Sequence, residues 1–371
     1  MRRRKFWAVT LLWPLSKVYG WIIAIRNAMF NHGILRQHTF DIPVVVVGNI
    51  AVGGTGKTPH TEYLVEKLSQ TNRVAVLSRG YKRKTHGFLV ASSRSLPDDI
   101  GDEPAQIYRK FEGKIPVVVC ENRVKGINGI ISELPNVSTV VLDDAFQHRY
   151  VKPTVSLVLI EYGRPPYRDY LLPYGRLREP QNALNRADIV VVTKCPASAK
   201  PMDYREFKEN LNLYPFQKLY FSTYDYLPLK PVFPEYVDEI PSLDFMSSSD
   251  VIISVTGISN PLPFVRHLRS SGAKVKVLRF GDHHNFSSAD ITAIERKFAK
   301  AGSGRKIIVT TEKDAIRLEK SGIFPKSLKP SLFYLPVSVE ILSPMGQQQP
   351  LEDAVRQCIR ENLNNSGSEN C

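Results

Sequence analysis

The residues best suited to chemistry lie in one glycine-rich stretch, residues 51–58, which comprises Ala51, Val52, Gly53, Gly54, Thr55, Gly56, Lys57 and Thr58. Glycines let backbone N–H groups surround phosphate oxygens without a Cβ in the way. Lys57 would reach the β- and γ-phosphates of a nucleotide, and the Thr58 hydroxyl would face Mg²⁺. The usual phosphate-binding pattern begins with glycine where this chain has Ala51. The stretch therefore predicts an ATP-binding P-loop, with an ordinary glycine-rich turn as the alternative.

Two adjacent acids, Asp143 and Asp144, follow an apolar β-branched run at residues 139–142. A strand that ends in aspartate downstream of a P-loop is typical of the element that holds Mg²⁺ in nucleotide-binding proteins. The carboxylate would bind the ion alongside the Thr58 hydroxyl. Of the two acids we favour Asp144 as the direct ligand, with Asp143 orienting it.

A second acidic pair, Asp102 and Glu103, lies between Gly101 and Pro104, just before a predicted helix at residues 105–111. Proline suits the first turn of a helix, and an acid before it suits the N-cap. Adjacent acids at a loop–helix junction are also suited to Mg²⁺ binding or to general-base catalysis. The residues by themselves leave both interpretations open.

Histidines follow a later predicted strand, since Asp282, His283 and His284 come soon after residues 275–280. Side chains at the carboxyl end of a strand in an α/β sheet are placed for chemistry. These three residues would also suit a metal ion, but no further cluster of ligands accompanies them. Another polar segment, residues 310–314, is predicted to cap a helix.

Apolar segments place these side chains at strand ends. Runs that indicate buried strands lie at residues 43–47, 73–81, 116–120, 139–142, 155–160, 188–194, 251–255, 275–280 and 306–310. After the P-loop, residues 61–68 show the spacing of apolar residues that is typical of a helix. The pattern predicts an α/β fold, a P-loop NTPase-like parallel sheet domain with a second, smaller α/β domain. The expected divisions are an N-terminal helix at 1–31, a P-loop core at 32–152, a second domain with connecting segments at 153–345, and a C-terminal helix and tail at 346–371.

The composition is that of a globular protein, with 371 residues of which 43% are hydrophobic and 23% charged. The four cysteines are widely spaced, which argues against a disulfide framework or a zinc site and fits a reducing compartment. The net charge of +14 suits nucleic acid or anionic lipid. No nucleic-acid-binding pattern is visible, so we expect no nucleic-acid partner, and nothing indicates a protein partner.

The N-terminal segment carries half of this net charge within residues 1–40, where no acid occurs. Its charge-free run, residues 6–16, is too short to span a bilayer, and no signal-peptide cleavage site follows. On a helical wheel the next residues separate into a polar half and an apolar half, the latter with Val18, Trp21, Ile22, Ile25, Met29 and Phe30. We expect a helix that lies on an anionic membrane surface. Packing of the apolar half on the protein's own core is the alternative.

In their order along the chain, the motifs together resemble the tetraacyldisaccharide 4′-kinase family, the lipid A 4′-kinases. Ala145 departs from the family pattern, which usually has glycine after the two aspartates. The matching stretches are Gly48-Asn49, Gly53-Gly54-Thr55-Gly56-Lys57-Thr58-Pro59, Gly101-Asp102-Glu103-Pro104, Asn122-Arg123-Val124, Asp143-Asp144-Ala145-Phe146-Gln147-His148, Leu171-Leu172-Pro173, Leu177-Arg178-Glu179-Pro180, Asp282-His283-His284 and Thr311-Glu312-Lys313-Asp314-Ala315.

The resemblance implies a transferase of lipid A and lipopolysaccharide biosynthesis that moves the γ-phosphate of ATP to the 4′-hydroxyl of a tetraacyldisaccharide 1-phosphate. It implies that Asp102 and His283 deprotonate this hydroxyl, and that Glu103 and one of Asp143 and Asp144 bind Mg²⁺. It also implies an enzyme on the cytoplasmic face of the inner membrane, attached peripherally or monotopically through its N-terminal helix. A regulatory P-loop NTPase at the membrane is the rival, but it leaves that helix, Asp102 and His283 without a role.

Overall fold

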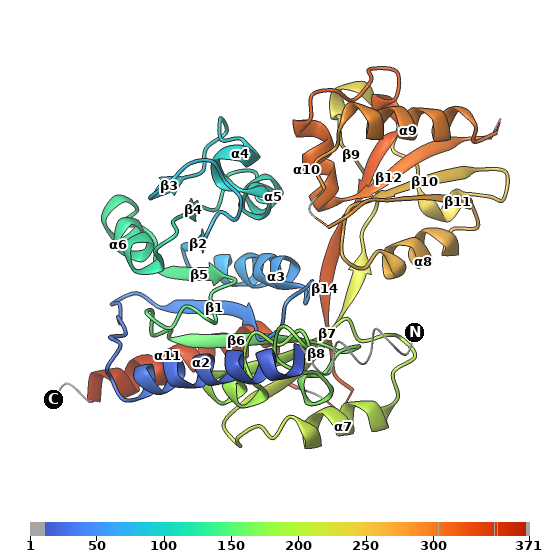
Figure 1. Cartoon of the computed structure of the whole chain (residues 1–371). Coiled ribbons are helices and arrows are strands. Elements are labelled where there is room, and N and C mark those ends of the chain that lie inside the picture. The colour runs from blue at the N-terminus through green and yellow to red at the C-terminus, as the bar shows by residue number, and fades with distance from the viewer. Residues whose placement is uncertain (1–11, 283, 303, 345, 347, 369–371) are drawn as a thin grey trace.

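The computed structural model describes residues 12–368, apart from residues 283, 303, 345 and 347. Within this part of the chain, the strands form one sheet of nine strands and one of five (Figure 1). The strands of the larger sheet are β1 (Val44–Asn49), β2 (Val74–Ser78), β3 (Leu89–Val90), β4 (Val117–Val119), β5 (Thr139–Asp143), β6 (Val155–Glu161), β7 (Ile189–Thr193), β8 (Lys218–Tyr226) and β14 (Val337–Leu342). Those of the smaller sheet are β9 (Lys230–Pro231), β10 (Val251–Thr256), β11 (Lys274–Arg279), β12 (Lys306–Thr311) and β13 (Leu332–Leu335).

Helices cover both sheets. The α-helices are α2 (Trp13–Asn31), α3 (Lys57–Ser69), α4 (Pro97–Ile100), α5 (Asp102–Lys110), α6 (Arg123–Glu133), α7 (Pro201–Asn210), α8 (Leu262–Ser270), α9 (Ser288–Ala299), α10 (Glu312–Lys320) and α11 (Leu351–Ser368). Short 3₁₀ helices are η2 (Pro166–Arg168), η3 (Gln181–Arg186), η4 (Pro234–Tyr236), η5 (Leu243–Phe245) and η6 (Lys329–Ser331).

The larger sheet has the order β14-β8-β7-β6-β1-β5-β2-β4-β3, and β1 pairs in parallel with both β5 and β6. Every residue of β1 and β5 is buried, which explains why these strands are continuous apolar runs. Alternate side chains of β1 point to opposite faces, so Val44 and Val46 enter one core cluster and Val45 and Val47 the other. Parallel pairing brings the carboxyl ends of β1, β5 and β2 to one edge, where the predicted site residues follow.

The range expected for the second domain, residues 153–345, contributes strands to both sheets. β6, β7, β8 and β14 join the larger sheet, whereas β9 to β13 form the smaller one. β8 and β14 pair antiparallel at one edge of the larger sheet and extend side by side toward the smaller lobe (Figure 1). We therefore propose a division by sheet: the larger lobe is the nine-stranded sheet with its helices, and the smaller lobe is residues 227–336.

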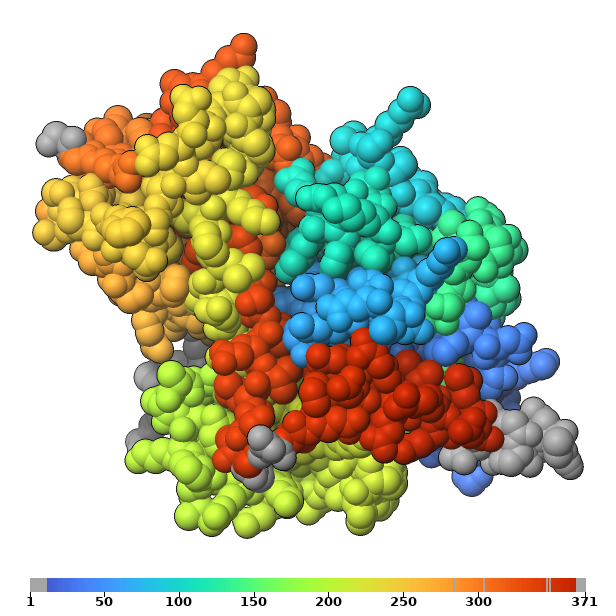
Figure 2. All heavy atoms as spheres, turned by 180° about the vertical axis from the view of Figure 1, so that it is seen from behind, coloured from blue at the N-terminus to red at the C-terminus, as the bar shows by residue number. Residues whose placement is uncertain are grey.

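The C-terminal helix α11 returns to the larger lobe. Figure 2 shows it from behind in red, beside the blue α3. Leu351, Ala354 and Val355 are buried in the core cluster that also contains Leu64 of α3. The Tyr63 hydroxyl on α3 donates to a Glu352 carboxylate oxygen at 2.7 Å. The helix that begins with the P-loop is therefore packed against the last helix of the chain.

The N-terminal helix α2 lies on the larger lobe with its polar side inward. Ser16 Oγ donates to the Leu171 carbonyl at 2.8 Å, and Tyr19 Oη donates to the Arg178 carbonyl at 2.9 Å. The large apolar side chains that point to solvent are Trp13, Leu15, Val18, Trp21, Ile22 and Ile25. Packing of the apolar half on the protein's own core is therefore wrong for these residues, although Phe30 at the end of the helix is buried. Within the described residues, no helix combines the length and apolar character needed to cross a bilayer.

Candidate active site

The glycine-rich stretch forms a loop between β1 and α3, as the P-loop prediction requires. Gly53 and Gly56 have φ angles of 116° and 92°, a region that side chains with a Cβ rarely adopt. A Cβ on Gly56 would also lie 2.0 Å from the Tyr224 hydroxyl oxygen. Helix α3 begins at Lys57, directly after this glycine, so its free N–H groups face the loop. This backbone is suited to surround an anionic phosphate.

Hydrogen bonds from neighbouring strands hold the loop in shape. Asn49 Nδ2 donates to Thr55 Oγ1 at 2.7 Å, and Thr193 Oγ1 donates to the Thr55 carbonyl at 2.8 Å. Lys194 donates to the Gly54 carbonyl and pairs with Glu161 at 3.2 Å. Thr193 and Lys194, at the end of β7, therefore support the loop. This support preorganises the N–H groups before a ligand binds.

The predicted residues Ala51 and Val52 lie at the start of the loop, against the segment after η2. Ala51 bridges with Leu177, and the Val52 N–H donates to the Arg176 carbonyl at 2.8 Å. The backbone amide of Val52 is therefore already bonded within the protein. The phosphate-facing part of the loop begins after it.

His60, in the first turns of α3, was not predicted as a site residue. Its ring is buried, with Nδ1 2.8 Å from the Gly56 carbonyl and Nε2 2.9 Å from Ser222 Oγ. Burial lowers the pKa of His60 to about 4, so the ring is neutral and Nδ1 carries the proton that Gly56 accepts. The only signal in the sequence was its position one turn after the loop glycine.

The two aspartates at the end of β5 have different surroundings. Asp144, whose φ is 50°, lies 3.6 Å from the Lys57 ammonium and 3.2 Å from the Arg178 guanidinium. Asp143 is buried and accepts a hydrogen bond from Thr61 Oγ1 at 3.1 Å. Arg178, in the segment between β6 and β7, thus joins the P-loop lysine on one carboxylate.

Negative charge accumulates around Asp143. Burial, followed by the charges of Glu103 and Asp144, raises the pKa of Asp143 to about 7, against the opposing effect of Lys57. A divalent cation beside these carboxylates would offset their repulsion, so the donor set fits Mg²⁺. Among the described residues, no group of three or more His, Cys, Asp or Glu side chains gathers closely enough to hold a metal. The fit is therefore that of an ion held by one or two carboxylates together with phosphate oxygens.

The acidic pair Asp102 and Glu103 forms the first turn of α5. The N-cap is Gly101, and no side chain caps this helix end, so the capping interpretation of Asp102 is wrong. Asp102 instead lies 2.9 Å from Arg317 Nε, and Glu103 lies 2.9 Å from Lys313 Nζ. Both cations belong to α10 in the smaller lobe. The two lobes therefore meet at the carboxylates that the sequence marked for chemistry.

The strand-end histidine motif is described only in part, because His283 lies outside the described residues. His284 Nε2 lies 2.9 Å from Asp290 Oδ2, and its ring stacks on Phe280 with 4.9 Å between centroids. His284 therefore binds the start of α9. The cap predicted within residues 310–314 is confirmed, since Thr311 Oγ1 accepts from the Asp314 N–H at 3.2 Å.

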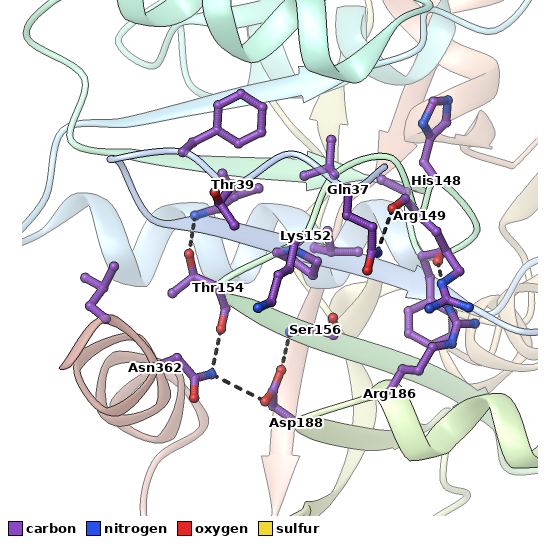
Figure 3. Close-up of a pocket in the computed structure, with 18 of the residues that line it drawn as sticks. Gln37, Thr39, His148, Arg149, Lys152, Thr154, Ser156, Arg186, Asp188 and Asn362 are labelled. Carbon is purple, nitrogen blue, oxygen red and sulfur yellow. Dashed lines mark hydrogen bonds between the residues drawn. The ribbon is translucent and has the colours of Figure 1, made fainter. Parts of the chain in front are cut away.

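A separate cavity of about 860 Å³ lies against β1 and β6, under residues 145–154 (Figure 3). Arg149 and Arg186 lie at one end, and Asp188 and Asn362 lie at the other. Of the residues that the structure describes, its lining includes none from the loop at 51–58. The cavity is thus distinct from the phosphate-binding loop.

Comparison with known proteins gives matches along nearly the whole chain. A family model for tetraacyldisaccharide-1-P 4′-kinase matches residues 8–359. A tetraacyldisaccharide 4′-kinase of Bacteroides thetaiotaomicron is 46% identical over 362 residues, covering 96% of this chain and 94% of the relative. One of Flavobacterium johnsoniae is 41% identical over 354 residues, covering 95% and 98%.

A solved structure agrees in fold. The crystal structure of LpxK from Aquifex aeolicus in complex with ATP matches with a TM-score of 0.69 and 28% identity, covering 93% of this chain and 98% of that one. The family match and the identities above 40% extend through both lobes, from the N-terminal helix to α11. This chain therefore belongs to the tetraacyldisaccharide-1-P 4′-kinase family.

Proposed function

We propose that this protein transfers the γ-phosphate of ATP to the 4′-hydroxyl of a tetraacyldisaccharide 1-phosphate, a lipid A precursor. The observation that carries this proposal is the P-loop beside strand-end carboxylates, in a chain that belongs to a 4′-kinase family. A rival regulatory NTPase would hydrolyse ATP without an acceptor.

The test is incubation with γ-labelled ATP, with and without the disaccharide lipid. Label that moves to the lipid supports the kinase, whereas acceptor-independent release of phosphate contradicts it. Lys57→Ala is the matched inactive variant, because Lys57 would bear on the transferred phosphate. Lys125→Ala, an exposed lysine on α6, serves as the neutral control.

For ATP, we assign the phosphates to the backbone N–H groups of residues 53–58 and to Lys57. The positive φ angles of Gly53 and Gly56 and the bonds that hold Thr55 support this assignment. The lysine would have to leave Asp144 for the γ-phosphate, a change that costs little because their 3.6 Å contact is long for an ion pair.

For Mg²⁺, we assign the Thr58 hydroxyl, Asp143 and Glu103 as the protein's ligands, directly or through water. The raised pKa of Asp143, caused by burial and by the charges of Glu103 and Asp144, supports this choice. When bound, Mg²⁺ supplies positive charge that stabilises the phosphoryl oxygens. Asp144 would instead orient Lys57 and Arg178, which reverses the preference that the sequence suggested.

We assign Asp102 and His283 as the base that removes the proton from the 4′-hydroxyl. A sugar hydroxyl is a poor nucleophile at neutral pH, so a base must take its proton as the oxygen–phosphorus bond forms. The position of Asp102 at the contact between the lobes supports this role, because substrate that bound between them would meet it. His283 would complete the pair.

For localisation, we assign α2 to the cytoplasmic surface of the inner membrane, as a peripheral or monotopic anchor. The exposed apolar face of this helix and its lysine and arginine residues support membrane binding. Such an anchor would keep the active site at the surface where a lipid substrate resides.

A further inference from the structure

We propose that Arg317 is a positioning residue for the phosphoryl transfer: it fixes the Asp102 carboxylate when the smaller lobe docks on the larger one. The inference rests on the proposed role of Asp102 as part of the base. The segment 310–314 was predicted from the sequence to cap a helix, and Thr311 does cap α10. On this helix, Lys313 and Arg317 also pair with Glu103 and Asp102, the acids that begin α5.

The guanidinium of Arg317 joins two carboxylates from different lobes. Arg317 is 3% exposed, and its Nε lies 2.9 Å from Asp102 Oδ2. Its Nη1 lies 3.0 Å from Asp314 Oδ1, and the same atom lies 3.5 Å from the Gly257 carbonyl. Because the guanidinium is planar and rigid, its bond to Asp314 sets the direction from which Nε meets the Asp102 carboxylate.

Asp314 anchors Arg317 to the backbone of the smaller lobe. This carboxylate is fully buried, and its Oδ2 accepts from the Gly257 N–H and from Thr311 Oγ1, both at 2.8 Å. Contacts within the smaller lobe therefore hold Arg317 in place independently of its bond to Asp102. Its position does not depend on the flexibility of an exposed side chain.

Gly257 extends the network to the loop after β11. A Cβ on Gly257 would lie 2.9 Å from Asp314 Oδ1, 3.2 Å from the Gly281 carbonyl and 3.5 Å from His284 Cβ. The backbone at 257 thus packs against residues on either side of position 283. Through Gly257 and Asp314, Arg317 connects the acidic start of α5 to the histidine-bearing loop.

Other charged side chains of α10 also pair with opposite charges on α5 and on α4. Lys313 pairs with Glu103 at 2.9 Å, Glu319 pairs with Arg109, and Lys320 pairs with Asp98. The pairs of Glu319 and Lys320 are partly exposed, so each contributes little to the stability of the contact. Arg317 is the buried residue of this contact, so packing constrains its side chain more than it constrains the exposed pairs.

The test is a comparison of Arg317→Lys and Arg317→Gln with the unchanged protein. Lysine keeps the charge but cannot hold both carboxylates with one planar group. We expect kcat to fall at least tenfold in Arg317→Lys and further in Arg317→Gln, with KM for ATP changed by less than threefold, because the P-loop binds the nucleotide. Glu319→Gln, which breaks an exposed pair on the same helix, should leave kcat within twofold.

A double-mutant cycle separates positioning from a general structural role. In an Asp102→Asn background, Arg317→Lys should lower kcat by less than twofold, because groups that act as a unit are non-additive. Thermal melts of each variant, with activity measured well below the melting temperature, separate catalysis from unfolding.

Two outcomes would overturn the inference: a folded Arg317→Gln protein with normal kcat, or an Arg317→Lys penalty equally large without the Asp102 carboxylate. An Asp102→Asn enzyme with normal kcat would contradict the proposed base, and the inference with it. Normal Arg317 variants beside an inactive Asp102→Asn would contradict the inference alone.

Discussion

At the residue scale, the two aspartates at the end of β5 have different surroundings, although the sequence made either one a candidate ligand for Mg²⁺. Asp144 contacts two cations, Lys57 and Arg178, while Asp143 is buried with further negative charge nearby. A carboxylate that already has two cationic partners gains little from a third. A buried carboxylate beside other acids would be stabilised more by a cation, and this difference supports the proposed assignment of Asp143 to the metal.

The corresponding prediction compares Asp143→Asn with Asp144→Asn. Asp143→Asn should raise the Mg²⁺ concentration needed for half-maximal activity several-fold, because a neutral amide is a weaker ligand for this cation. Asp144→Asn should mainly lower kcat, since Lys57 and Arg178 lose the group that orients them. Initial rates across a Mg²⁺ titration distinguish the two, and an increased Mg²⁺ requirement confined to Asp144→Asn would reverse the assignment.

At the scale of elements, α3 and α2 differ in which of their side chains are buried and which are exposed. Helix α3 carries Lys57 at its first position and His60 one turn later, buried against Gly56 and Ser222. Helix α2 turns the hydrogen-bonding side chains of Ser16 and Tyr19 inward and exposes Trp21, Ile22 and Ile25. The contacts of its side chains, and not its mean polarity, set the orientation of each helix.

Helix α3 gives a prediction about pH. The pKa of His60 is lowered to about 4 from an ordinary 6.5 by burial, so the unfolded chain binds more protons than the native one between these values. Stability is therefore unaffected by His60 above about pH 6.5 and falls as the pH drops toward 4. From pH 7.5 to pH 5 the loss due to this group is about 2 kcal/mol.

Urea unfolding of the unchanged protein and of His60→Gln, at both pH values, measures this effect. Glutamine can still donate to the Gly56 carbonyl but does not titrate, so the variant should lose about 2 kcal/mol less on acidification. An identical pH dependence in the two proteins would show that His60 is not the group responsible.

Helix α2 gives a prediction about membrane attachment. Replacing Trp21 and Ile25, which are 69% and 62% exposed, with serine should reduce binding to anionic vesicles at least tenfold, because the apolar area that enters the interface is lost. The fold should be unaffected, since neither side chain is buried. Vesicle co-sedimentation measures binding, and melting temperature checks the fold.

Ile131→Ser is the matched control for this experiment, because Ile131 is an exposed isoleucine on α6 at 40% exposure. It should bind vesicles like the unchanged protein. The Trp21 and Ile25 variant should also retain kinase activity on substrate dispersed in detergent, because the P-loop is untouched. Undiminished vesicle binding by that variant would rule out α2 as the apolar anchor.

At the scale of the whole molecule, two lobes meet at α5 and α10, and a net charge of +14 acts on any surface nearby. Long-range attraction brings a basic protein to an anionic bilayer, but it is screened within about 10 Å at ordinary salt. The apolar face of α2 acts only on contact and is not screened. Attachment is therefore expected to have a salt-sensitive part and a salt-resistant part.

Raising the salt concentration from 0.1 M to 1 M should thus weaken binding to anionic vesicles several-fold without abolishing it. Neutral vesicles should bind more weakly and with little dependence on salt. Co-sedimentation across a salt series provides the measurement. Complete release by salt alone would mean that charge, and not apolar contact, holds the protein to the bilayer.

The sequence by itself determined the elements of the P-loop site. The buried strands, the glycine-rich loop and the acids at strand ends were predicted because periodicity, backbone freedom and strand-end position are local properties. The predicted ranges 43–47, 139–142 and 61–68 overlap β1, β5 and α3, although β1 continues to Asn49 and α3 already begins at Lys57. The amphipathic character of the N-terminal helix is local in the same sense.

Only the tertiary structure decided which partners these residues meet. Asp102 and Arg317 are 215 positions apart, and the periodicity of neither segment indicates the other. Whether the apolar half of α2 faces solvent, whether Asp143 or Asp144 is buried, and that β14 returns to the larger sheet all depend on packing between distant segments. The sequence gives the charge and polarity of each side chain. The pKa and the binding properties of that side chain depend on its dielectric surroundings and ion pairs, which arise only when the chain is folded.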